Sequence, residues 1–241
     1  FYPFILMDVP PGNNKPDPWG GAEQGAYPWR GRITVSPAPG RDGSPDGTAA
    51  ATAAAEAFVG TVRASDFAVS EDGVGYAGPA EWSLSRMALH YAALCASAGG
   101  DDAFLVASEL RGLTTIRGPG DSFPFVEGLR RVAADAKALL PAATKVSYAA
   151  DWSEYFGHHP ADGTGDVFFH LDPFWADPAV DFVGIDVYWP LADWRDGTGH
   201  LDAAIADTTH DPAYVAANVA GGEGFDWFYA SAADRAAQVR T

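Results

Sequence analysis

The sequence predicts an α/β protein with a parallel sheet, a partial (β/α)8 TIM barrel that is truncated at both ends. Three observations lead to this fold class. Four short, nearly all-apolar runs alternate with helical patterns, as strands do when helices cover both faces of a parallel sheet. Each run ends in an acid or in an acid followed by an aromatic residue. A complete barrel needs eight strands in typically about 250 residues, and here long loops use up the chain on four.

The first predicted strand is the apolar run Phe1 to Asp8, with no element before it. A segment rich in Pro, Gly, Asn and Asp follows over about residues 9–47, and an insertion loop of that length is either functional or disordered. An alanine-rich helix is expected from Ala49 to about Phe58. Pro79 opens a stronger helix that should run to Ala98 and stop at the glycine pair 99–100.

The second and third predicted strands flank a helix. The second strand ends at Ser108, and a helix from about Pro124 to Leu140 follows it and stops at Pro141. The third strand, 145–150, ends in Asp151 and Trp152. The remaining expected elements are a short helix at 172–175, a fourth strand at 182–189 that carries Asp186 and Tyr188, and shorter helices at about 201–206, 212–220 and 230–239.

The ends of the chain predict an internal piece of a longer protein. The chain opens with Phe1 inside an apolar run, and it closes at Thr241 within an alanine-rich helical pattern that lacks a cap. No linker or internal repeat is visible between the ends. We therefore expect one domain over residues 1–241.

Glu109 directly follows the apolar run Phe104–Ser108, and two interpretations of it stay open. A buried strand that delivers an acid to its C-terminal end is how barrel enzymes present catalytic groups. Alternatively, Glu109 is a salt-bridged residue at a helix start with Arg111 as its partner, because most charged side chains are solvated or paired. Four strand ends with acids on one edge favour a single polar, aromatic-rimmed cleft.

Composition excludes several classes of function. The chain carries 32 Asp and Glu against 15 Lys and Arg, a net charge of −17, which argues against nucleic acid and anionic membranes as partners. No run approaches the roughly 20 apolar residues of a membrane span. The glycine-rich stretches lack phosphate-loop spacing, so no nucleotide cofactor is expected. The single cysteine, Cys95, is expected in the core.

A metal site is not expected either. His158, His159, Asp162 and His170 fall close together in the sequence, but their spacing matches no standard zinc pattern. We interpret them as part of a solvated loop.

Several long motifs resemble one known family. They are FYPFILMDVP, YPWRGRI, SELRGLTTIR, KVSYAADWSEYFGH, DVFFHLDPFWADPAVDFVGIDVYWPLADWRDG and AGGEGFDW. Together they resemble the TIM-barrel-like domain of gene transfer agent and phage host-specificity tail proteins. The same landmarks are similar to clan A glycoside hydrolases of the β-mannanase kind. That likeness implies that the four strands are about the third to sixth of a barrel.

The resemblance implies roles for individual residues. Glu109 matches the general acid/base of a retaining two-carboxylate mechanism. The nucleophilic carboxylate of such enzymes ends the seventh strand, which this fragment lacks; Glu223 sits in a glycine-rich loop and is not assigned that role. Residues that match positions around the substrate cleft are Asp8, Trp29, Arg30, Tyr148, Asp151, Trp152, Asp186 and Tyr188.

Alternatives to these roles remain. Asp151 stands where the hydrolases usually have Asn, and Trp152 and Tyr188 could simply pack at the barrel mouth. Arg30 could instead brace Glu109 or a neighbouring Asp, and a guanidinium keeps such an acid ionised, which works against an acid catalyst.

The resemblance also implies a biological setting. The expected function is a glycoside-hydrolase-like domain of a phage or gene transfer agent tail protein that acts on or binds host cell-surface or cell-wall polysaccharide. The expected partners are that glycan and other tail or baseplate proteins. The protein would be made in the bacterial cytoplasm and act, in a phage-like particle, at the host surface. The alternative is a catalytically inactive structural or receptor-recognition module of the tail tip.

Overall fold

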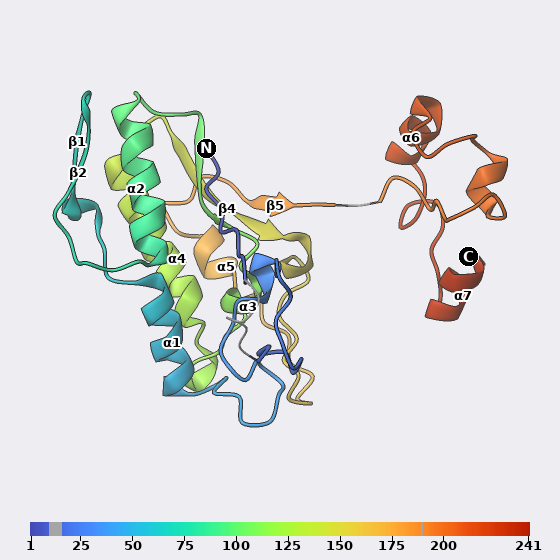
Figure 1. The fold of residues 1–241 in the computed structure, drawn as a ribbon, viewed down its shortest axis with the longest axis horizontal. Coiled ribbons are helices and arrows are strands. Elements are labelled where there is room, and N and C mark those ends of the chain that lie inside the picture. The colour runs from blue at the N-terminus through green and yellow to red at the C-terminus, as the bar shows by residue number, and fades with distance from the viewer. Residues whose placement is uncertain (10–15, 189) are drawn as a thin grey trace. The chain divides into compact units, whose positions relative to one another are not determined.

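A parallel three-stranded sheet in the order β3-β4-β5 organises the first part of the chain (Figure 1). The structure is a computed structural model that describes residues 1–9, 16–188 and 190–241. Strand β3 spans Ala103–Ser108, β4 spans Lys145–Asp151 and β5 spans Gly184–Asp186. Both pairings are parallel, so the C-terminal ends of the three strands meet at one edge, as the sequence predicts.

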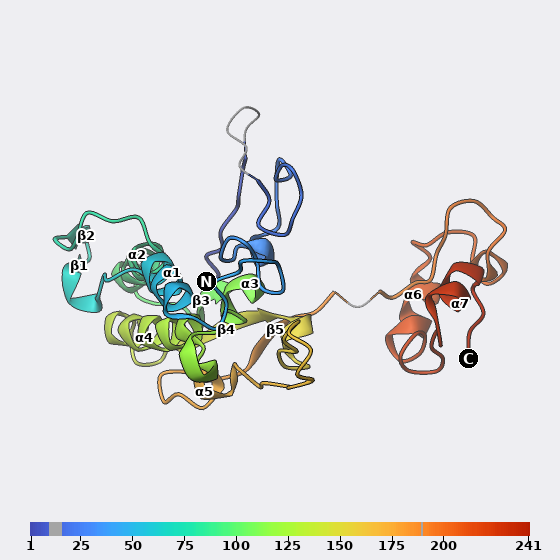
Figure 2. The same ribbon diagram turned by 90° about the horizontal axis from the view of Figure 1, so that it is seen from below.

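Three helices pack on one another (Figures 1 and 2). They are α1 (Ala49–Val59), α2 (Leu84–Ser97) and α4 (Pro124–Leu139), and α2 and α4 also pack on the sheet. The hydroxyls of Thr48 and Ser83 accept backbone N–H bonds at the starts of α1 and α2, which satisfies donors that a helix N-terminus leaves free. Helix α2 therefore begins later than Pro79. None of the described helices combines the length and apolarity that a membrane crossing requires.

The core lies between the helices and the sheet. Burial alternates over the first four residues of β3, where Phe104 and Val106 are fully buried, whereas β4 is buried at every position from Val146 to Asp151. Cys95 belongs to this core, as expected. The buried side chains with the largest volumes are Tyr148, Phe104, Phe125 and Phe174.

An antiparallel hairpin that the sequence analysis did not predict packs on α2. Its strands are β1 (Phe67–Ser70) and β2 (Gly73–Tyr76). Within the described residues, four shorter α-helices and five 3-10 helices complete the fold. The α-helices are α3 (Arg111–Thr114), α5 (Asp172–Trp175), α6 (Pro212–Val219) and α7 (Ala232–Ala237), and the 3-10 helices are η1 (Arg30–Arg32), η2 (Ala64–Asp66), η3 (Pro119–Asp121), η4 (Trp152–Glu154) and η5 (Leu201–Ala204).

The expected buried strand at residues 1–8 is wrong. Only Phe1 pairs with β3: its amino group donates to the Ala103 carbonyl at 2.5 Å, and its carbonyl accepts from the Leu105 N–H at 3.0 Å. Pro3 has no N–H to continue the ladder. Leu6 is 80% exposed, so the apolar run is not a buried one.

The fourth strand is also shorter than expected. The sequence predicts a strand over residues 182–189, and the structure forms one only over Gly184–Asp186. Residue 189 lies outside the described residues.

The chain divides into two compact units, Phe1–Val187 and Tyr188–Thr241. The first holds the sheet, helices α1 to α5 and the β1–β2 hairpin; the second holds η5, α6 and α7. The single domain over residues 1–241 stays a prediction.

Candidate functional site

Glu109 stands at the point where β3 leaves the sheet. Its N–H donates to the Ala149 carbonyl of β4 at 2.8 Å, so strand pairing continues up to this residue. Its φ is 49°, in the left-handed region that few non-glycine residues adopt. Such a conformation persists only where surrounding contacts impose it, and it is enriched at functional sites.

Two side chains from a distant loop fix the Glu109 carboxylate. The Trp29 indole Nε1 donates to Glu109 Oε2 at 2.9 Å, and Arg30 Nη2 lies 2.8 Å from the same oxygen. The structure thus brings three predicted site residues together. Of the two arginines considered as partners, Arg30 makes the ion pair and Arg111 does not.

The loop that carries Trp29 and Arg30 lies very close to the segment after Glu109. A Cβ on Gly112 would lie only 2.5 Å from the carbonyl oxygen of Ile33, and a Cβ on Gly31 would clash with the Trp29 ring. Glycine at 112 lets α3 approach the η1 backbone closely, and glycine at 31 makes room for the Trp29 ring. This contact places Arg30 on the strand end.

Arg30 connects Glu109 to a polar chain along the sheet edge. Its Nε donates to the Ser108 carbonyl at 3.1 Å and its Nη2 to Ser108 Oγ at 2.8 Å. The Tyr2 hydroxyl donates to Asp186 Oδ2 at 2.5 Å and accepts from Ser108 Oγ, which also lies 3.2 Å from Asp186 Oδ2. Burial and the hydrogen bond to Asp186 raise the pKa of Tyr2 to about 12. Sequence reasoning missed Tyr2 and Ser108, whose roles depend on neighbours in space.

The end of β4 presents a second polar group. Asp151 is buried and lies opposite Asp186 in the sheet register. Its Oδ1 accepts the Ser153 N–H at 3.1 Å and so caps the start of η4. Asp151 and Asp186 therefore belong to the same sheet edge as Glu109, as predicted.

Tyr148 occupies the helix side of β4 rather than the sheet edge. It is fully buried, and its hydroxyl accepts the Leu110 N–H at 2.7 Å and donates to Glu154 Oε2 at 3.2 Å. Burial, followed by the nearby Glu154 charge, holds its pKa well above the ordinary value. In this position the ring offers no face to a ligand, and its visible role is to hold the backbone just after Glu109.

The other predicted cleft residues are more exposed. Trp152 is 41% exposed and packs edge-on against Phe156. Asp8 is exposed at the end of the first run. Tyr188, 72% exposed, belongs to the second compact unit.

A cleft of about 580 Å³ is lined by Trp29, which bonds the buried Glu109, and by Arg111; Glu109 itself is not among the lining residues. Aromatic rings, arginines and histidines make up most of its wall. Its lining includes Trp19, Trp29, Arg32, Arg111, Trp152, Glu154, Phe156, His158, His159 and His170.

Glu154 is a buried acid that the sequence analysis did not select. Its Oε1 accepts from the Thr114 hydroxyl, and its Oε2 accepts from Tyr148 and, at 2.8 Å, from the Asp151 N–H. His170 Nε2 lies 3.8 Å from Oε1. The signal that could have found it is the capping-box spacing from Asp151 to Glu154.

The histidine segment is only in part the solvated loop expected from the sequence, since His159 and Asp162 are exposed. His170 is 3% exposed, and His158 is half-buried with its ring edge-on to Phe123. An isolated antiparallel bridge pairs His158 with Phe168, and the rings of His158 and His170 lie 6.0 Å apart between centroids. No group of three or more His, Cys, Asp or Glu within the described residues is arranged to hold a metal ion.

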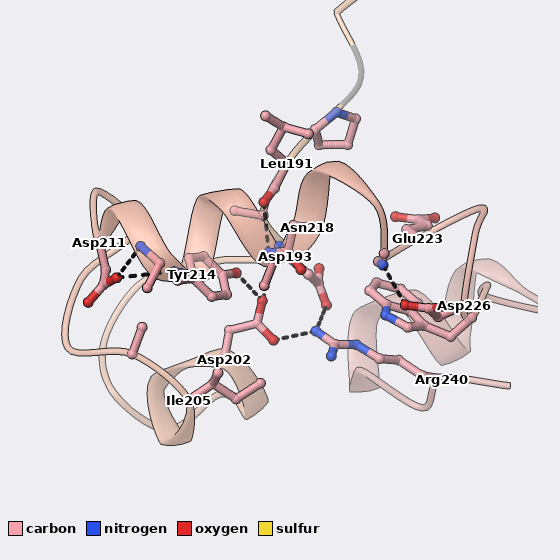
Figure 3. A pocket seen from close by; sticks show the side chains of 18 residues that line it. Leu191, Asp193, Asp202, Ile205, Asp211, Tyr214, Asn218, Glu223, Asp226 and Arg240 are labelled. Carbon is pink, nitrogen blue, oxygen red and sulfur yellow. Dashed lines mark hydrogen bonds and ion pairs between the residues drawn. The ribbon is translucent and has the colours of Figure 1, made fainter.

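The second unit has a cleft of its own, of about 520 Å³ (Figure 3). Its charged groups bind one another: Arg240 pairs with Asp193 at 2.9 Å and with Asp202. Burial opposes ionisation of Asp193, but hydrogen bonds from Tyr229 and Arg240 lower its pKa to about 2. Glu223 pairs with Arg235, in keeping with its exclusion as a nucleophile.

A parallel sheet with polar strand ends on one edge is the architecture of a TIM-barrel-like domain. Residues 82–241 match the family described as a GTA TIM-barrel-like domain. The chain belongs to this family. The sheet is three strands wide, and the described residues do not close it into a barrel, as expected of a partial barrel.

The family match covers some of the candidate site residues and not others. Glu109, Tyr148, Asp151, Trp152, Asp186 and Tyr188 lie within the matched residues, whereas Asp8, Trp29 and Arg30 precede them. The comparison with curated proteins found no match.

Proposed function

We propose that the C-terminal edge of the β3-β4-β5 sheet is the glycan site of a glycoside-hydrolase-like domain, with Glu109 as its general acid/base. The observation that carries this proposal is the geometry of Glu109. A strand end delivers it, a left-handed backbone turns it out of the sheet, and Trp29 and Arg30 fix one carboxylate oxygen. Both contacts engage Oε2, which assigns proton transfer to Oε1.

The surroundings of Glu109 are chemically suited to sugars. Trp29 and Trp152 are 39% and 41% exposed, and both line the adjoining cleft. Partly exposed indole rings provide apolar faces for sugar rings, and carboxylates such as Asp186 accept hydrogen bonds from sugar hydroxyls. A cleft of about 580 Å³ is within the usual size of small-ligand sites.

A retaining mechanism requires a second carboxylate about 5–5.5 Å from the acid/base. The proposal assigns it to a barrel strand other than β3, β4 and β5. Hydrolysis is therefore a property of the closed barrel, and glycan binding is the part of the function that this chain provides.

We further propose the setting that the family name supports. The domain would be part of a tail protein of a phage or gene transfer agent particle, in contact with other tail or baseplate proteins. It would be made in the bacterial cytoplasm and would act on polysaccharide at the host cell surface or wall.

Hydrolysis by the full-length protein, with Glu109→Gln beside the wild type, tests the catalytic role. If Glu109 is the acid/base, Glu109→Gln should lower the turnover of polysaccharide by about 100-fold or more, because the sugar leaving group needs a proton. It should keep much more of its turnover on an aryl glycoside whose leaving group needs none. Unchanged turnover of polysaccharide by Glu109→Gln would remove Glu109 from the mechanism.

A second candidate function is glycan recognition without chemistry. The ion pair between Arg30 and Glu109 favours it, because a guanidinium 2.8 Å from the carboxylate stabilises a fixed anion as a binding group. In that case full-length protein would bind polysaccharide and release no reducing ends, with or without Glu109→Gln.

A further inference from the structure

Arg111 is an unpaired cation beside Glu109 in a strongly acidic chain. Acids outnumber bases by 32 to 15 in the sequence, so most cations have an acid partner available. Arg32, the other arginine of the cleft, bonds Asp17 at 2.7 Å. Arg111 is exposed and makes no ion pair with any residue that the structure describes. It therefore leaves a positive charge on the wall of the cleft.

Glu154 is the acidic residue among those that line the cleft, and it does not pair with Arg111. Both oxygens of Glu154 accept hydrogen bonds from inside the protein: from Thr114, from Tyr148 and from the Asp151 N–H. Its side chain is fully buried. An anionic group that enters the cleft would thus meet an available guanidinium and no exposed carboxylate of the lining.

His158 supplies the cleft with a hydrogen-bonding group that carries no charge at neutral pH. Burial, then the neighbouring His170, lowers the pKa of His158 to about 4, so its ring is neutral at neutral pH. The Nε2 atoms of His158 and His170 are both buried without a partner among the described residues. Buried polar atoms are normally hydrogen-bonded, so a hydroxyl or water that enters between them would satisfy them.

The same cleft offers apolar ring faces. Trp29 and Trp152 line it and are each about two-fifths exposed. A ligand that fits these features combines a sugar ring, hydroxyls and one carboxylate. A guanidinium binds a carboxylate through two parallel hydrogen bonds, which makes it selective for that group.

We propose that this cleft binds a hexuronic acid residue of an acidic polysaccharide, with its carboxylate on Arg111 and its ring against Trp152. This inference rests on the proposed glycan function and names the class of sugar for the same site. The contact between Arg111 and the sugar carboxylate would make the domain specific for polysaccharides that carry carboxylates, such as those of acidic capsules and slimes.

Calorimetric titration of the full-length protein with matched oligosaccharides tests the proposal. The probes are tetrasaccharides of galacturonate, of mannuronate and of alternating glucuronate and N-acetylglucosamine, each beside its carboxyl-reduced, neutral form. At least one acidic form should bind at least about tenfold more tightly than its reduced form, because only the charge-assisted contact differs.

Variants assign the preference to Arg111. Arg111→Gln should abolish the difference between the acidic and reduced forms, and Arg111→Lys should restore part of it. Lys145→Gln removes the same charge at the opposite end of β4 and should leave the preference intact. Circular dichroism of each variant verifies that the fold is retained.

Three outcomes would overturn the proposal. Equal binding of acidic and reduced forms would remove the uronate specificity and leave the glycan function standing. A preference that survives Arg111→Gln would place the carboxylate elsewhere. Binding of none of the tetrasaccharides, acidic or neutral, would overturn this inference; a full-length protein that nevertheless hydrolyses neutral polysaccharide would show that the proposed function survives it.

Discussion

Arg30 and Glu109 form an ion pair of 2.8 Å between Nη2 and Oε2, in which the arginine side chain is 15% exposed and the glutamate side chain 5%. Seventy-nine positions separate the two residues in the sequence, so the pair ties the long loop before α1 to the end of β3. The same guanidinium binds Ser108, and through it reaches Asp186 on β5. The arrangement of Glu109 and Ser108 at the strand end therefore depends on Arg30.

Replacing Arg30 should destabilise the protein markedly. Arg30→Met leaves the Glu109 carboxylate buried without its cation, and breaking a buried pair from one side costs about 3 kcal/mol or more. Denaturant unfolding measures the loss. Arg41→Met is the control, because Arg41 is exposed and should change stability by no more than about 0.5 kcal/mol. If both variants lose the same free energy of unfolding, the ion pair between Arg30 and Glu109 does not stabilise the protein.

The left-handed backbone at Glu109 should make the stability of variants depend on the shape of the new side chain. Its φ of 49° suits asparagine, whereas a β-branched side chain crowds the backbone there. Glu109→Asn and Glu109→Val both remove the carboxylate, so their difference isolates the backbone effect. Glu109→Val should unfold at lower denaturant, by about 1–2 kcal/mol. A valine variant as stable as the asparagine variant would contradict the left-handed conformation.

Tyr2 should make stability fall at high pH. Its pKa in the folded protein is raised from 10.0 to about 12 by burial and by the bond to Asp186. A group whose folded pKa is raised contributes stability below the unfolded pKa and loses it as pH rises through the folded value. The difference in unfolding free energy between wild type and Tyr2→Phe should therefore shrink from pH 10 to about 12. A difference that stays constant over this range would contradict the bond to Asp186.

His158 should make stability fall on the acid side. Burial and the neighbouring His170 lower its folded pKa from 6.5 to about 4. Between those values the unfolded chain binds a proton that the folded protein does not, so stability falls as pH drops from 6.5 towards 4.

The His158→Gln variant should show a shallower loss over that range. His159→Gln is the matched control, since His159 is the adjacent residue and is exposed. If His158→Gln and wild type lose stability in parallel, the half-buried position of His158 is contradicted.

The sequence predicts the elements whose pattern is local. Strands β3 and β4 and helices α1, α4 and α5 lie where their apolar periodicity and proline signals place them. The carboxylates Glu109, Asp151 and Asp186 reach one edge because parallel strands end on the same side. The family resemblance is confirmed over residues 82–241.

What the sequence could not predict depends on partners in space. Apolar residues 1–8 predict a buried strand, but only Phe1 finds a ladder partner in β3. On α2, Tyr91 and Leu94 follow helical spacing yet are 39% and 40% exposed, since the buried face includes Leu89 and Ala92 instead. The β1–β2 hairpin turns at an Asp-Gly pair, but its strands of four residues each are too short for a clear alternating pattern.

The candidate site was predicted in outline and not in its connections. Strand ends predict Glu109, and the long loop supplies Trp29 and Arg30, but only the fold shows that all three meet. Glu154 carries only a capping-box spacing from Asp151, which does not show that it is buried, and the importance of His170 follows from its burial.

Indole N–H resonances of ¹⁵N-labelled protein test the central claim, glycan binding beside Glu109, most directly. The Trp29 indole donates to Glu109, Trp152 lines the same cleft, and Trp82 is 98% exposed on the surface. On titration with polysaccharide fragments, we expect the Trp29 and Trp152 signals, assigned with Trp29→Phe and Trp152→Phe, to shift saturably while Trp82 stays unchanged. Shifts confined to Trp82, or no shift at saturating glycan, would contradict the account.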